Sequence, residues 1–275
     1  MDWAKAKNII LVLLLILNLF LFINILNIEE TFAYSHEYRN KAKQALEQNG
    51  LTITCNIPTN NNPIPRISFV KKDKNVNMYA GIIDKLTGVS EVVLRDEYYS
   101  NNGKTLIFSD KRFLFSDETG GITLPVDNEK RLDRILKAWI KENEISKENF
   151  VLDDIRTQDN RVIVTYHQLY KRKPVFNNEI IFTIENEKLV SVEGSLRIFY
   201  DIKESKKEEV VSVEIVLLTG KDKITDSITS IELGYFLAHE DDLYDTMVWR
   251  IQLSTGEQVM FNAYTGEWID PNSSI

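Results

Sequence analysis

The chain has 275 residues, of which 43% are hydrophobic and 27% charged, and its formal net charge is −8 at pH 7. This acidic balance argues against binding to nucleic acid, an anionic membrane surface or an anionic wall polymer through charge alone. Cys55 is the only cysteine, which excludes an intramolecular disulfide. The length suits two or three domains that are stabilised by their apolar cores.

The N-terminal part predicts a membrane anchor. Residues 9–28 contain no charged side chain, and about 20 apolar residues at a rise of roughly 1.5 Å per residue cover the hydrocarbon core of a bilayer. The charged residues that flank this span are Lys5, Lys7, Glu29 and Glu30. Basic residues before the span predict a cytoplasmic tail at residues 1–8, with the rest of the chain outside the membrane.

The apolar span is longer than that of a typical secretory signal peptide, and residues 31–33 match a cleavage site only weakly. We therefore favour an uncleaved transmembrane helix over a secreted protein. Asn18, Asn24 and Asn27 interrupt the span and are candidate intramembrane contacts to partner helices, because a buried amide in lipid seeks a hydrogen-bond partner. They do not form a single stripe, so they can equally be tolerated polar residues.

A first extracytoplasmic unit is predicted over residues 29–120. Helical spacing over 31–49 ends at Gly50, and a loop rich in proline and asparagine covers 58–65. The predicted strands are 51–57 (which includes Cys55), 66–71, 76–84, 88–95, 105–109 and 112–115. Tyr98 and Tyr99 cannot both point inward on one strand, so one of them is a candidate contact with a partner ectodomain.

A second unit is predicted over residues 125–203. Asp127 can cap a helix with an amphipathic stripe, whose members are Leu132, Ile135, Leu136, Trp139 and Ile140. The strands expected after this helix are 150–157, 161–170, 175–185 and 189–200. A helix followed by an antiparallel meander is therefore the expected order.

A third unit is predicted over residues 204–275 and begins in the charged run 203–209. Residues 210–219 fit either a helix or a strand, and we interpret them as a helix that ends at Gly220. The strands expected after it are 228–238, 246–253, 258–263 and 267–270. The sequence thus predicts an α+β fold, in which a transmembrane helix precedes tandem units of a helix and an antiparallel sheet.

The sequence offers little catalytic chemistry. His36, His167 and His239 lie in different predicted units and lack the spacing of metal ligands. We interpret His167 as a solvent-facing or sheet-packed strand residue, and residues 239–242 as a solvated hairpin turn. No nucleophile elbow, phosphate loop or dinucleotide fingerprint occurs. The expectation is a protein that is not an enzyme and has no metal or cofactor.

Several segments resemble the YycI family. They are Met1-Asp2-Trp3 before the anchor, residues 231–236 (Ile-Glu-Leu-Gly-Tyr-Phe), residues 248–250 (Val-Trp-Arg) and residues 261–267 (Phe-Asn-Ala-Tyr-Thr-Gly-Glu). The resemblance implies a membrane-anchored, extracytoplasmic regulator of a Gram-positive bacterium. Such a protein would act with a YycH-like partner on the sensor histidine kinase WalK, also called YycG, through transmembrane and ectodomain contacts. It implies no catalysis and leaves the sign of the regulation open.

Two other functions remain as alternatives. The last strand–turn–strand element also looks like PepSY-type modules, so a protease-regulating module of the propeptide or inhibitor type is the second hypothesis. A wall-polymer binder or hydrolase is the third. The lack of a plausible pair of catalytic carboxylates or a metal set counts against hydrolysis.

Overall fold

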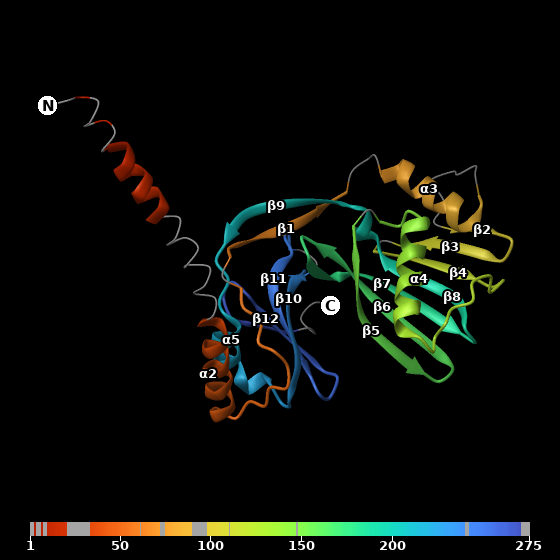
Figure 1. Ribbon diagram of the computed structural model, residues 1–275. Helices are drawn as coiled ribbons and strands as arrows, with labels where there is room; N and C mark the ends of the chain where they lie inside the picture. Colours follow the sequence, from red (N-terminus) through yellow and green to blue (C-terminus); the bar gives the residue numbers. More distant parts are fainter. Residues whose placement is uncertain are drawn as a thin grey trace.

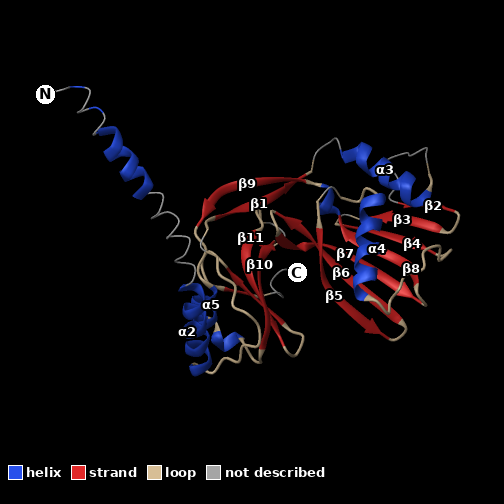
Figure 2. Ribbon diagram, viewed as in Figure 1, coloured by secondary structure: helices blue, strands red, loops and turns tan. Residues whose placement is uncertain are grey.

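The computed structural model describes residues 3, 7, 10–20, 34–60, 62–71, 75–89, 98–109, 111–146, 148–239 and 242–270, with only the backbone described at 34–39 and 75–78. It confirms the predicted α+β class. Helices pack beside a large sheet in which most neighbouring strands are antiparallel. Two lobes are visible in Figures 1 and 2, each with its own apolar core.

The first of these, the inserted lobe, comprises residues 75–199. Helices α3 (Asn75–Thr87) and α4 (Glu129–Glu142) lie against one face of its antiparallel sheet (Figure 1). In spatial order, the strands of that sheet are β2 (Tyr98–Asn101), β3 (Lys104–Phe108), β4 (Arg112–Asp117), β8 (Lys188–Ser195), β7 (Lys173–Glu185), β6 (Arg161–Tyr170) and β5 (Phe150–Gln158). A short 3-10 helix, η2 (Leu196–Phe199), ends the lobe.

The second, the terminal lobe, comprises residues 34–70 and 201–270. Its helical elements are α2 (Tyr34–Gln48), α5 (Val213–Thr219) and the 3-10 helix η3 (Lys221–Lys223). Its strands are β1 (Ile64–Val70), β9 (Asp201–Glu208), β10 (Ile228–Phe236), β11 (Thr246–Leu253), β12 (Gln258–Asn262) and β13 (Trp268–Ile269). Strands β10 to β13 form an antiparallel meander, and β1 pairs with β9 in a separate two-stranded ribbon.

The chain leaves and re-enters the terminal lobe at one place. Val70, the last residue of β1, pairs with Asp201, the first residue of β9. The inserted lobe is thus an insertion between two adjacent strands. The predicted first unit, residues 29–120, contributes Leu46 and Ile67 to one core but Ile82 and Phe113 to the other. The cores are therefore not arranged as three consecutive segments of the chain.

Two predicted strands have a different structure, and a third falls largely outside the described residues. Residues 76–84 belong to helix α3, because Ile82, Ile83 and Leu86 are spaced to bury one helical face, and Gly88 ends the helix with a φ of 72°. Residues 51–57 form no strand; Ile53 makes one isolated parallel bridge to Ile228. The predicted strand 88–95 lies outside the described residues from 90 onward.

The predicted strand 189–200 ends at Ser195, where the Ser195 hydroxyl accepts a hydrogen bond from the Arg197 backbone N–H and starts η2. The charged run 203–209 is not a boundary between units. It forms most of β9, in which Lys203 pairs with Ser68 and Glu204 with Ile67. A strand on the surface tolerates charged side chains, because its ladder bonds come from the backbone.

Other predictions are confirmed. Helix α4 buries Leu132, Leu136, Trp139 and Ile140, although its N-cap is Asn128 rather than Asp127. The ambiguous run 210–219 contains helix α5. The strands predicted over the terminal meander match β10 to β13 to within a few residues.

Residues 10–20 are helical, and each apolar side chain from Ile10 to Phe20 is more than half exposed. Within the part of the chain that is described, no helix is both long and apolar enough to cross a membrane. Lys7 and Asn18 are exposed helical residues. The other residues predicted for the anchor, Lys5, Asn24, Asn27, Glu29 and Glu30, lie outside the described positions.

Candidate functional site

The hairpin of β6 and β7 carries the inserted lobe onto the terminal lobe. Gln168 pairs with Val175 and His167 with Glu179, so residues 176–178 of β7 have no partner in β6. Beyond this irregularity Val175 pairs in parallel with Tyr235 of β10 and is buried in the core of the terminal lobe. The tip of this hairpin therefore pairs with a strand of the terminal lobe, while the rest of the hairpin belongs to the sheet of the inserted lobe.

Close backbone packing at this joint requires a glycine. A Cβ atom on Gly234 of β10 would lie 2.6 Å from the Phe176 Cζ atom and 2.6 Å from the Pro174 carbonyl oxygen. The backbone N–H of Leu237 also donates a 2.6 Å hydrogen bond to Asn177 Oδ1. Strand β10 and the start of β7 are thus held in direct contact.

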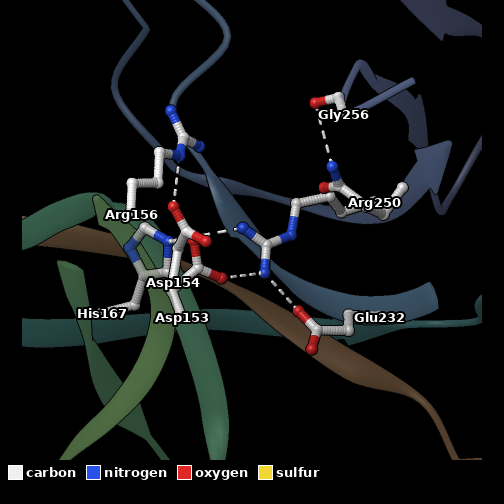
Figure 3. A network of polar contacts seen from close by, with 8 residues as sticks. Asp153, Asp154, Arg156, His167, Glu232, Arg250 and Gly256 are labelled. Carbon is white, nitrogen blue, oxygen red and sulfur yellow. Dashed lines mark hydrogen bonds and ion pairs between the residues drawn. The ribbon is translucent and has the colours of Figure 1, made fainter. Parts of the chain in front are cut away.

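An ionic network connects the two lobes at the same place (Figure 3). The Arg250 guanidinium of β11 donates hydrogen bonds to Asp153 of β5 and to Glu232 of β10. His167 Nε2 lies 3.1 Å from Asp153 Oδ2 and 3.4 Å from Arg250 Nη1. The Phe176 ring lies under the guanidinium, with 4.2 Å between its centroid and Arg250 Cζ. One arginine thus holds a carboxylate from each lobe.

Strand alternation explains why His167 faces the terminal lobe. The preceding residue, Tyr166, points toward helix α4, where its hydroxyl donates to Asp133 Oδ1 over 3.0 Å. Because successive strand residues point to opposite faces, His167 lies on the face that no helix of the inserted lobe covers. Asp153 sits at a register irregularity of β5 and points to the same network.

Burial and charge have opposite effects in this network. Burial by itself raises the pKa of Asp153, but the hydrogen bonds from His167 and Arg250 and their charges outweigh it, so the pKa lies well below its ordinary value. Burial lowers the pKa of Arg250, and the hydrogen bond and charge of Asp153 more than restore it. Both groups are therefore ionised at neutral pH.

A second ionic contact joins the lobes near η2. Arg197 of the inserted lobe pairs with Asp245, whose side chain is only 1% exposed. The guanidinium carbon of Arg197 also lies 4.3 Å from the Phe69 ring centroid. Burial raises the pKa of Asp245 to about 6, although Arg197 acts to lower it. The backbone of Asp245 also bonds to Ile67, which fixes it to β1. Arg197 is thus inserted between two elements of the terminal lobe.

The face that carries His167 is open at its far end. Tyr98 pairs with Ile107, and Ile107 with Leu114, and all three side chains are exposed. Tyr98 is 58% exposed and Tyr99 only 7%, which confirms that the two residues do not both point inward. Their role as a partner contact stays a prediction, and neither lies in the ionic network.

The terminal lobe has an open cavity of about 540 Å³. The loop between β10 and β11 forms one wall with His239, Asp242, Leu243 and Tyr244. The Asp242 N–H donates a hydrogen bond to the His239 carbonyl oxygen, while residues 240 and 241 of the predicted turn lie outside the described positions. Leu243 is 82% exposed. The cavity lies beside Thr246, the neighbour of Asp245 in the chain.

Sequence analysis missed the ionic network. The sequence pattern indicates an ordinary strand residue at His167 and assigns no contact to Asp153 or to Glu232, although Glu232 lies in the segment 231–236 that resembles the YycI family. A signal was present in β11, where Arg250 interrupts the apolar residues 247–251, and a buried charge in such a run requires partners. The sequence could not say which carboxylates supply them, because Asp153 lies 97 positions away.

The arrangement is suited to holding two lobes together. The carboxylates of Asp153 and Glu232 are engaged by Arg250, and among the described residues no group of three His, Cys, Asp or Glu side chains is placed to hold a metal ion. Fold and junction together define a class: a two-lobed α+β protein whose buried polar groups join its parts.

Comparison with known proteins gives the family. The sequence model described as YycI protein matches residues 29–264, so the chain belongs to the YycI family. This membership supports a regulatory role in the pathway of the YycG (WalK) kinase. No curated protein matches the chain significantly.

One solved structure that resembles the chain is the YpeB C-terminal domain of Bacillus megaterium. Its sequence is 13% identical, and the alignment covers 74% of this chain and 97% of that one with a TM-score of 0.40. A likeness at this level carries no argument about activity or partners.

Proposed function

We propose that this protein is a non-enzymatic regulator, anchored by a single N-terminal transmembrane helix, that binds a WalK-like sensor kinase together with a YycH-like partner. The observation that carries the proposal is the family match over residues 29–264. The described helical residues 10–20, with their exposed apolar side chains, support an anchor in lipid.

The anchor brings the chain beside a kinase in the membrane, with the lobes on the outer side. Intramembrane contacts through Asn18, Asn24 and Asn27 and ectodomain contacts through exposed residues such as Tyr98 would then act together. To change kinase activity, the protein must bind one signalling state better than the other. A tenfold preference needs only about 1.4 kcal/mol, and interhelical hydrogen bonds in lipid contribute about 0.6–2 kcal/mol each.

Co-purification tests the proposal. The full chain, extracted in mild detergent with the kinase and the YycH-like protein, should recover both partners. Replacing Asn18, Asn24 and Asn27 by leucine should reduce that recovery, whereas a Leu14→Ile control in the same helix should not. Unchanged recovery with the leucine variant would remove the asparagines from the mechanism. Failure of the intact chain to recover the kinase would contradict the proposed function itself.

A reporter fusion tests the anchor separately. An enzyme that is active only outside the cytoplasm, fused after residue 40, should be active and remain in the membrane fraction. Release of the active fusion into the culture medium would show cleavage and contradict the anchor.

A further inference from the structure

We infer that the junction between the lobes is a two-position joint, closed by the ion pairs of Arg250 and Arg197, and that the inserted lobe turns against the terminal lobe when these pairs separate. The physical joint stands on the structure alone. Its use in signalling rests on the proposed function, because a bound partner would act by favouring one of the two positions.

The covalent connections allow such a movement. Both chain crossings lie side by side, at Val70 and Asp201, and adjacent crossings at one edge form a natural hinge. The remaining link is the β6–β7 hairpin, whose tip is bound to the terminal lobe. Residues 176–178 have no partner in β6, so the hairpin can bend there without breaking paired ladder bonds of β6.

The ionic contacts over this bend are few, and they stand beside the Leu237–Asn177 hydrogen bond and the packing of Phe176 against Gly234. Arg250 neutralises Asp153 from the inserted lobe and Glu232 from its own lobe, and the side chain of Arg250 is 8% exposed. Arg197 makes the equivalent contact with Asp245. Charged groups regain their hydration when they separate, which offsets much of the lost attraction. The electrostatic part of the joint's energy therefore depends on a small number of identified pairs.

The closed position leaves several polar atoms at the junction unpaired. Among the described residues, buried side-chain atoms with no protein hydrogen-bond partner include His167 Nδ1, Asn178 Oδ1, Arg197 Nη1, Asp245 Oδ2 and Thr246 Oγ1. Such atoms oppose burial because they lose bonds that water provides. Turning the lobes apart would give them access to water. These unpaired atoms thus reduce the free-energy difference between the closed and open positions, compared with a junction that buried only apolar groups.

The joint offers a route for regulation. A partner that contacts the inserted lobe, for example at its open sheet face with Tyr98, favours whichever position presents that face better. The reciprocal also holds, since a change of position alters the affinity for the partner by the same factor.

Distance measurements by pulsed electron paramagnetic resonance on the full chain in lipid nanodiscs test the joint. Spin labels at Lys130→Cys of α4 and Glu257→Cys of the β11–β12 turn report between lobes, with Cys55→Ser removing the native thiol. We expect Arg250→Gln to raise the ratio of a second interlobe distance to the main one about tenfold. Arg156→Gln is the matched control, because its partner Asp154 lies on the same strand.

A second label pair, at Glu118→Cys and Lys130→Cys, lies within the inserted lobe and checks that it remains folded. If Arg250→Gln broadens this internal distance, the Asp153→Asn variant decides instead, because Asp153 is the partner from the inserted lobe and its loss leaves Arg250 paired with Glu232. Interlobe distances that match the unsubstituted protein in the deciding variant would overturn the joint. If the distances support the joint but the protein does not co-purify with the kinase, only the proposed function is contradicted.

Discussion

At the scale of single residues, Arg250 is the most consequential side chain of the described structure. It lies in a strand whose residues are nearly all buried, and it engages carboxylates of both lobes. Removing one member of a buried ion pair typically costs about 3–5 kcal/mol, because the remaining charge is left without a partner. Buried ion pairs often add little net stability compared with apolar residues of similar volume, so the contribution of Arg250 is chiefly to specify how the lobes meet.

Asp245 makes the folded protein sensitive to pH. Its folded-state pKa is raised from 3.8 to about 6 by burial, against the effect of Arg197. The folded state therefore holds the proton more tightly than the unfolded state. This contribution to stability is fully present below pH 3.8 and is lost as the pH rises toward 6, an effect on the order of 2–3 kcal/mol.

A carbon-13 NMR titration of the full chain checks this prediction. The Asp245 carboxyl signal, identified by its absence in Asp245→Asn, should titrate with a midpoint near 6. Relative to Asp245→Asn, the unsubstituted protein should lose stability toward urea between pH 4 and pH 6. A midpoint below 4, or a relative gain of stability over this interval, would show that Arg197 dominates over burial.

At the scale of elements, local pattern and final structure agree where one face alone is buried. The amphipathic stripe of α4 is predictable for this reason, whereas β6 buries residues on both of its faces around Tyr166 and His167. Residues 76–84 misled because β-branched and aromatic residues there favour strands, whereas the three buried positions of α3 fit one helical face. The charged run 203–209 was predicted to begin a new unit. Most of it instead forms β9, because it pairs with β1.

The N-cap of α4 is a residue at which the sequence prediction and the structure differ. Asn128 Oδ1 accepts a 3.0 Å hydrogen bond from the Arg131 backbone N–H, whereas the sequence pattern had favoured Asp127. Asn128→Ala should lower the free energy of unfolding by about 0.5–2 kcal/mol. Asp127→Ala, the matched control, should have a clearly smaller effect. Urea unfolding followed by circular dichroism measures both, and a larger loss at Asp127 would contradict the cap.

At the scale of the whole molecule, the insertion changes which parts of the chain can fold together. Among the described residues, every buried residue of the inserted lobe's core lies between Ile82 and Phe199. The core of the terminal lobe instead combines residues from Leu46 to Ile67 with residues from Val213 to Ala263, and also takes in Val175 from the β6–β7 hairpin. The continuous lobe can form before the rest of the chain is made, while the discontinuous one requires both ends.

Fragments of the chain test this arrangement. A fragment of residues 71–200 should fold alone, with dispersed amide signals in NMR spectra and a cooperative urea transition. The fragment of residues 29–120 should not, because it contains only part of each core. Exposure of Val175 and Tyr170 at the hairpin tip should reduce the solubility of the first fragment. A folded 29–120 beside an unfolded 71–200 would contradict the two-core assignment.

The sequence by itself determined the α+β class, most strands after residue 100, helix α4 and the family, because hydropathy period, turn residues and motifs are local properties of the chain. Only the tertiary structure decided that β1 pairs with β9, that one lobe is inserted into the other, and that Arg250 meets Asp153 and Glu232. Each of these depends on contacts between residues far apart in the chain, whose register is selected by the cores they share rather than by any local pattern.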